Sequence, residues 1–360
     1  MITIDGVLAT VASSVGDDLL TLGRATDWDD AEAALGSVLG EPRDFLLLND
    51  AFAVDPLVVD IAAGATIEVP VVVVHVVSGT DGGAVFPRTI IRAGPGSRAG
   101  VLEIVVDVDA GLLAGLPSDS SPSPMRTGGG GAEQLVVPVS EITVADDAAL
   151  SYVSVQALGP RGWQLAHQAS VIGAGATLDS FAVALGGGYA RLRTDSALRG
   201  ESGTSRLRAA FIGRDDQMLD FRTLQDHVAP RTTSDLLFMG AVADRAHSVY
   251  SGLIRVRRGA FRSDAMQTNH NLVLDEGAHA DSVPNLDIEE NDVKCSHGST
   301  VGPVDEDQRY YLESRGVEPE MAERLIVGGF FDAIASQVPM AGLRSTVRQA
   351  LVDRSGAHGA

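Results

Sequence analysis

From about residue 62 the sequence is a succession of short β-rich runs separated by Gly, Asp, Ser and Asn, and this pattern limits the possible folds most. The runs include 67–77, 89–92, 101–108, 135–144, 150–155, 178–185, 205–212, 236–239, 252–256 and 271–274. No convincing amphipathic helix interrupts them, so folds that alternate strands with helices are disfavoured. The chain must bury its apolar residues mainly between strands.

Small-residue turns introduce several of these runs at similar intervals. The turns are Ala148-Ala149-Leu150, Ala176-Thr177-Leu178 and Gly203-Thr204-Ser205, with Gly259-Ala260 and Gly277-Ala278 following at a shorter interval. Strands that recur every ~20–30 residues indicate a parallel β-helix, whose rungs must stack because one rung cannot bury its inward face alone. A β-sandwich with irregular loops remains open as the alternative.

Three regions follow from the pattern. Residues 1–60 are mixed, with a strand expected at 2–4 and helices at 27–39 and 45–52. Residues 61–303 form the expected β-helix core, and residues 304–360 a C-terminal α-helical domain.

Within that last region, apolar spacing predicts helices over 305–313, 319–335 and 343–352. The Gly-, Pro- and Ser-rich run 117–131 is expected to be a surface loop, and its sequence assigns it no role.

The charge and the apolar runs exclude several classes of protein. The formal net charge is −21, which disfavours nucleic acid and anionic lipid as partners. No run approaches the ~20 apolar residues of a membrane helix, and residues 1–6 do not resemble a secretory signal. A cytoplasmic protein is expected.

One cysteine and one lysine stand side by side, as Lys294 and Cys295. A single cysteine excludes an intrachain disulfide, and it cannot hold an iron–sulfur cluster alone, because such clusters usually take four thiolates. A single lysine followed by cysteine excludes a Walker A loop, which needs Ser or Thr after the lysine. Any ATP hydrolysis associated with this chain must therefore belong to a partner.

The segment around Cys295 is the most distinctive in the chain. In an extended strand, Cys295 and His297 lie on the same face and can bind a soft or borderline metal together, or with ligands from a partner. Lys294 is expected to favour the thiolate. The alternative is a structural cysteine beside a hydrogen-bonded histidine, and the spacing alone does not decide between them.

Two further groups of polar residues merit comparison. His270, His279 and His297 lie among acidic residues and allow a metal site, although solvent-facing histidines are the more ordinary interpretation; the other five histidines show no spacing pattern. Arg214 with Asp215-Asp216 allows a carbohydrate-cleaving site on a β-helix, against the simpler interpretation of solvated acids in a turn.

Several ordered motifs resemble the SufB/SufD family of the SUF iron–sulfur cluster assembly system. They are Pro-Asn-Leu-Asp-Ile (284–288), Asp-Val-Lys-Cys-Ser-His-Gly-Ser-Thr-Val-Gly (292–302), Tyr-Tyr-Leu (310–312) and Ser-Arg-Gly (314–316), with weaker support at 48–52 and 251–272. The resemblance covers about residues 40–340. Lys-Cys-Ser-His-Gly resembles the SufD branch, whereas the Glu-His-Glu-Ala-type segment and multiple cysteines of SufB are missing, as is the longer N-terminal helical region of many SufD proteins.

The resemblance implies a right-handed parallel β-helix and a non-catalytic scaffold. It implies pairing with SufB along the β-helix edge and a transient cluster shared with SufB, with His297 and Cys295 as ligands; the isolated chain is expected to carry no cofactor. The SufC ATPase would dock on the C-terminal helices, where the expected contacts are Tyr310, Tyr311, Arg315, Gly316, Met321, Leu325, Phe330 and Phe331.

Two other functions stay open at this point. One is a SufB-like scaffold that pairs with itself, and the other is a carbohydrate-binding or carbohydrate-cleaving β-helix. The sequence does not indicate stoichiometry, cluster type, sulfur donor, or whether reduced flavin binds the complex.

Overall fold

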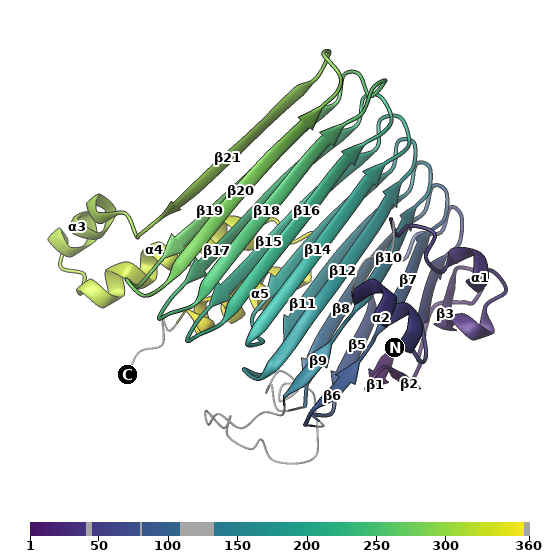
Figure 1. Ribbon diagram of the computed structural model, residues 1–360, viewed down its shortest axis with the longest axis horizontal. Coiled ribbons are helices and arrows are strands. Elements are labelled where there is room, and N and C mark those ends of the chain that lie inside the picture. The colour runs from purple at the N-terminus through teal and green to yellow at the C-terminus, as the bar shows by residue number, and fades with distance from the viewer. Residues whose placement is uncertain (41–44, 80, 109–132, 356–360) are drawn as a thin grey trace.

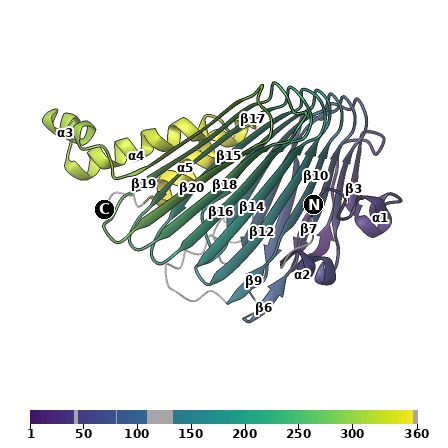
Figure 2. The same cartoon turned by 45° about the horizontal axis from the view of Figure 1, so that its top comes forward.

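The chain winds into a β-solenoid of about 8 turns, and of the residues that the structure describes 49% are in strands and 17% in helices. The computed structural model describes residues 1–40, 45–79, 81–108 and 133–355. Successive strands alternate between two facing sheets, so that each turn adds one strand to each sheet (Figures 1 and 2). The parallel β-helix prediction is confirmed.

Apart from β2, which lies outside β1, the strands of each sheet follow in chain order along the solenoid. The first sheet, called sheet A, contains β2 (Val7–Thr10), β1 (Ile2–Ile4), β5 (Val71–Val77), β8 (Arg98–Asp107), β11 (Ala149–Ala157), β13 (Thr177–Ala184), β15 (Thr204–Gly213), β17 (Thr233–Val242), β19 (Asp264–Val273) and β21 (Lys294–Gly302). The second, sheet B, contains β3 (Leu20–Arg24), β4 (Leu57–Ile61), β7 (Arg88–Ala93), β10 (Val139–Val144), β12 (Gly162–Ile172), β14 (Tyr189–Leu198), β16 (Met218–His227), β18 (His247–Val256) and β20 (His279–Ile288), with β6 (Gly83–Val85) and β9 (Gln134–Val136) beside them.

The small-residue turns seen in the sequence are the corners of the solenoid. β11, β13 and β15 begin at residues 149, 177 and 204, where the repeated turns predict strands, and they pair in parallel at equivalent positions. A residue with positive φ stands two positions before each of these strands, and the same holds for β17 and β19; these residues are Asp147, Gly175, Ser202, Arg231 and Arg262. The turns at 259–260 and 277–278 recur sooner because they introduce strands of different sheets, β19 and β20.

Side chains that alternate along each strand fill the space between the sheets. The inward positions are apolar near the N-terminal end, where Val73, Ile91 and Ile142 are fully buried. Further along, Phe211, Phe221, Phe238 and Tyr250 form a continuous stack with centroids 4.5 to 5.8 Å apart. Such contacts between successive rungs provide the apolar burial that single rungs lack.

The N-terminal region closes one end of the solenoid. β1 pairs antiparallel with β2, and β3 pairs antiparallel with β4, so each sheet ends in an antiparallel strand. The predicted strand at 2–4 and helix at 45–52 are present, the latter as α2 (Phe45–Phe52). The helix expected at 27–39 is wrong in extent: it is reduced to a 3₁₀ turn (Ala25–Asp27) and one turn of α1 (Ala31–Ala34), and Gly36 has a φ of +75°.

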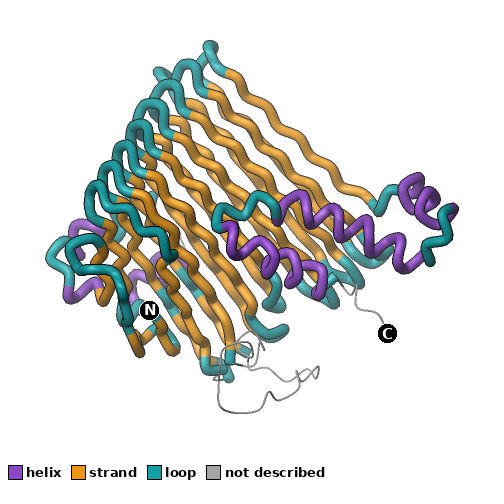
Figure 3. The backbone as a smooth tube through the Cα atoms, turned by 180° about the vertical axis from the view of Figure 1, so that it is seen from behind, coloured by secondary structure: helices purple, strands orange, loops and turns teal. Residues whose placement is uncertain are grey.

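The C-terminal helices lie on the outer face of sheet A (Figure 3). They are α3 (Glu306–Ser314), α4 (Pro319–Ala335), a 3₁₀ turn (Ala341–Leu343) and α5 (Arg344–Arg354). Val327, Phe331 and Ile334 of α4 pack with Val347 and Leu351 of α5 against buried sheet A residues. By contrast, α3 has no buried residue and projects beyond the sheet.

The predicted loop 117–131 lies outside the described residues. Within the described part of the chain, no helix is long and apolar enough to cross a membrane. The proposed boundaries at residues 60 and 303 remain predictions; the last solenoid strand ends at Gly302, and α3 begins at Glu306.

The aromatic stack gives a test of the packing. A Cβ added at Gly240 would lie 2.1 Å from a ring carbon of Phe211. We therefore expect Gly240→Ala to lower the free energy of unfolding by about 1–3 kcal/mol, because the buried ring must move. Gly23→Ala is the matched strand control, since its Cβ would meet nothing within 4 Å. Urea unfolding of both variants measures the difference, and equal stability would contradict the packing described.

Candidate functional site

Cys295 and His297 lie on the last strand of sheet A. In the parallel register, Cys295 is opposite Ala265 of β19 and His297 is opposite Gln267. Ala265 and Gln267 are buried inward-facing residues, so Cys295 and His297 occupy the same inward side one rung later. The spacing of two residues thus places both side chains on one face, as the sequence predicts.

No further rung covers this face in the described chain. β21 ends sheet A and β20 ends sheet B. Apolar side chains that would be buried by another rung are therefore exposed: Leu286 by 37%, Ile288 by 40% and Val301 by 44%. Both terminal strands also present an unpaired edge, which is the usual template for pairing with another chain. We call this surface, formed by the inward side and the edges of β20 and β21, the open end.

Cys295 is half-buried at one side of the open end. It packs on an apolar cluster that includes Ile254, Val256 and Ala265. This burial raises the pKa of the Cys295 thiol, and the nearby Asp264 carboxylate raises it further. The expectation that Lys294 favours the thiolate is therefore wrong: Lys294 lies on the opposite side of the strand, and burial dominates.

His297 is exposed at the centre of the open end. Gln267, directly beneath it in the register, is fully buried, and neither polar atom of its amide has a hydrogen-bond partner among the described residues. Buried amides ordinarily find partners, so the floor of the open end has hydrogen-bonding capacity that remains to be satisfied. The imidazole above and the amide below together form a polar patch on the open end.

The residues expected to contact an ATPase differ in their exposure. Tyr310, Tyr311, Met321 and Leu325 are exposed by 46–73%, and Arg315 and Gly316 are exposed at the end of α3. Phe330 is partly buried. Phe331, however, is completely buried against sheet A, so this residue stabilises the fold and is not available as a surface contact.

A groove of about 830 Å³ runs between α3 and α4. Its lining includes Tyr311, Leu325 and Phe330 from the predicted set, together with Leu312 and Ile326. The guanidinium of Arg315 lies 5.2 Å from the ring centroid of Tyr311. An apolar groove beside exposed tyrosines is typical of a surface that binds another protein.

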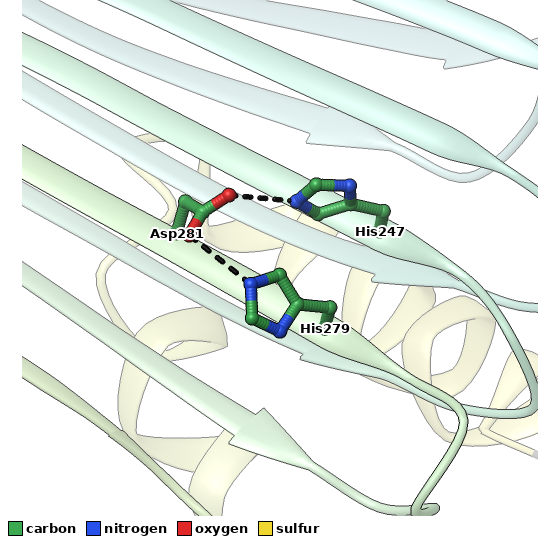
Figure 4. A group of neighbouring side chains, drawn as sticks. All are labelled: His247, His279 and Asp281. Carbon is green, nitrogen blue, oxygen red and sulfur yellow. Dashed lines mark hydrogen bonds and ion pairs between the residues drawn. The ribbon is translucent and has the colours of Figure 1, made fainter.

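The three histidines grouped in the sequence do not meet in space as one cluster. His270 lies on the outer side of sheet A, whereas His279 lies on the outer side of sheet B. His279 instead adjoins His247, its register partner on β18, and both imidazoles contact Asp281 (Figure 4). The sequence pattern did not identify His247 as part of this group. His247 and His279 are brought together by the length of one complete rung, and that length varies along the chain.

Two of the three residues proposed for a carbohydrate site, Asp216 and Arg214, form ion pairs within turns. Asp216 pairs with Arg245, while Arg214 pairs with Asp244. These contacts compensate the charges locally and do not converge on a shared cleft. Nothing in this arrangement favours glycan cleavage.

The geometry defines a β-solenoid protein whose terminal rung presents a thiol and an imidazole on an open, partner-type surface. Residues 75–330 match the core domain described as "SUF system FeS cluster assembly, SufBD core domain". The chain therefore belongs to the SufB/SufD family, and it is SufD-like.

Individual relatives agree with this assignment. The iron-sulfur cluster assembly protein SufD of Escherichia coli is 33% identical over 57% of this chain and 49% of its own length. An iron-sulfur cluster assembly SufBD family protein of Mycobacterium tuberculosis is 34% identical over 59% of this chain and 55% of its own length. SufD of Bacillus subtilis is 35% identical over 38% of this chain and 31% of its own length. The matches thus span about half, or less, of these relatives.

The environment of Cys295 predicts slow alkylation at neutral pH. Because burial and Asp264 raise the thiol pKa, the reactive thiolate fraction is smaller than for a free cysteine. We expect Asp264→Asn to increase the rate of iodoacetamide labelling at pH 7.5 modestly, by about twofold, because Asp264 is the lesser cause. Asp292→Asn serves as the acidic-residue control. A Cys295 that reacts faster than free cysteine would contradict this account.

Proposed function

We propose that this chain is a non-catalytic scaffold subunit of a cytoplasmic iron–sulfur cluster assembly complex. Its open end pairs with a SufB-type subunit, and the two chains together hold a nascent cluster. The single observation that carries the proposal is the presence of His297 and Cys295 on the uncovered inward side of the last rung.

The ligand count supports a site shared between two chains. Iron–sulfur clusters usually take four protein ligands, and this chain offers one thiol at the open end, with one imidazole beside it. A partner that adds its own strands to the edges of β20 and β21 would bury the exposed Leu286, Ile288 and Val301 and bring the remaining ligands. The iron and sulfide are cargo of this site.

The C-terminal helices supply the second surface. A SufC-type ATPase docks on the groove between α3 and α4, with Tyr310, Tyr311 and Leu325 as its principal contacts. These side chains are exposed, while the opposite side of α4 is fixed on sheet A. A movement of the ATPase would therefore be transmitted to the solenoid through α4, which packs on sheet A.

The His297→Ala variant tests the role of the imidazole. Because His297 is exposed, we expect the variant to fold and to co-purify with its partners. Loss of one ligand should lower the iron and acid-labile sulfide of the complex isolated anaerobically from native cells by at least about tenfold. His270→Ala, on the outer face of sheet A, is the matched control. A His297→Ala complex with normal iron and sulfide would remove this residue from the site.

Leu286→Lys tests the pairing surface. Leu286 is 37% exposed on the inward side of β20, and a partner strand would bury a charge there. We expect binding of the SufB-type subunit to weaken by at least about tenfold, measured by pull-down from native cells and by titration. Val72→Lys is the control, because Val72 is 40% exposed but lies on the distant strand β5.

The same open end also allows pairing with a second copy of this chain, since its edges and exposed apolar residues could meet across a twofold axis. The molar mass of the purified chain distinguishes the two arrangements. A stable homodimer that retains iron and is disrupted by Leu286→Lys would favour the self-pairing scaffold over the heteromeric one.

A further inference from the structure

A second group of metal-ligating side chains lies on the outer face of sheet B, away from the inward side that carries Cys295 and His297. His247 begins β18, and His279 begins β20, directly opposite it in the parallel register. Asp281 is two residues beyond His279 and therefore points to the same outer face. Figure 4 shows both imidazole rings directed at the one carboxylate.

The distances within this group are those of a compact ligand set. Nε2 of His247 is 2.9 Å from one carboxylate oxygen of Asp281, and Nε2 of His279 is 3.2 Å from the other. One ligand atom from each of the three residues lies within 4.8 Å of the others. Ligand atoms around a tetrahedral metal with bonds of about 2.1 Å are about 3.4 Å apart, so small rotations of these partly exposed side chains suffice.

We propose that His247, His279 and Asp281 form a binding site for one divalent transition metal, ferrous iron or zinc. Two imidazoles and one carboxylate match the ligand preferences of both ions, whereas Mg²⁺ and Ca²⁺ favour sites made of oxygen alone. The metal takes the place of the protons now shared between the imidazoles and the carboxylate. Its remaining coordination positions face solvent, at the edge strand of sheet B.

The composition of the surrounding face distinguishes this group from an ordinary surface ion pair. The neighbouring acidic residues on the outer side of sheet B all contact arginine: Asp195 pairs with Arg193 as well as His167, Asp220 with Arg191 and Arg222, Asp226 with Arg257, and Asp287 with Arg255. An arginine pairs with a carboxylate equally well but cannot ligate a metal at neutral pH. Asp281 is instead contacted by two histidines, whose imidazole nitrogens can bind a metal together with the carboxylate.

The three side chains are also open to solvent. The side chains of His247, His279 and Asp281 are 38%, 66% and 47% exposed, so an ion reaches them without opening the fold. The site thus exists before the metal arrives.

The proposal does not depend on the proposed function, because it uses none of the open-end residues. The test uses the untagged 360-residue chain carrying Cys295→Ser and His297→Ala, which removes the candidate ligands of the open end. Anaerobic titration with Co²⁺, followed by its visible absorption, should show one equivalent bound. Fe²⁺ and Zn²⁺ should each displace it, and whichever does so at lower concentration is the preferred ion; a large excess of Mg²⁺ should not displace it.

Variants locate the binding. His247→Ala and His279→Ala should each weaken Co²⁺ binding by at least about tenfold in the same background. His270→Ala, a partly exposed histidine on the other sheet, should leave it unchanged. The proposal is overturned if the two variants bind like their parent, if no Co²⁺ binds, or if Mg²⁺ competes as well as Zn²⁺. Because the open-end ligands are absent throughout, failure here leaves the scaffold function untouched.

Discussion

Parallel pairing of each strand with the equivalent strand of the next rung is the interaction on which the rest of this structure depends. It aligns side chains in columns, so that a residue's environment is fixed by the rungs before and after it. It also leaves two ends that need a different solution. At the N-terminal end, antiparallel strands β2 and β3 close the sheets. At the other end the described chain supplies no such strand, and inward-facing Leu286, Ile288 and Val301 remain exposed.

The interior changes character just before the open end. The aromatic column finishes with Phe238 and Tyr250, and the next rung of sheet A places the amides Gln267, Asn269 and Asn271 at inward positions. Only the last rung then carries Cys295 and His297. If the apolar core extended to the open end, the surface there would be entirely apolar and would offer neither metal ligands nor hydrogen-bonding groups. The amides instead provide a polar floor beneath the imidazole, and the aromatic column lies behind them.

Much of this architecture could be predicted from local pattern, and the exceptions have a common cause. The corner residues repeat because each rung needs the same turn, and the helix over 319–335 follows from its apolar spacing. Cys295 and His297 share a face because strand periodicity is local. The predictions that failed concern properties that depend on packing between residues far apart in the sequence. The face of α4 that meets sheet A buries Phe331 and leaves Leu325 exposed, and nothing within the helix decides between them. Likewise, the pKa of the Cys295 thiol is raised mainly by burial on the apolar cluster beneath it. That burial cannot be predicted from the neighbouring residue in the sequence, Lys294.

The pairing of His247 with His279 shows the same limit and also why two sites can coexist on one short stretch. Their meeting depends on the lengths of two turns and of an intervening strand of the other sheet, so no fixed interval in the sequence reveals it. Strand alternation then separates them from the open end: His279 and Asp281 face outward on sheet B, while Cys295 and His297 face inward on sheet A. A partner strand added to β21 would continue sheet A beside the inward ligands, whereas one added to β20 would continue sheet B and extend its outer face beside the histidines. A ligand from the second strand could therefore complete the outer site without changing the inner one.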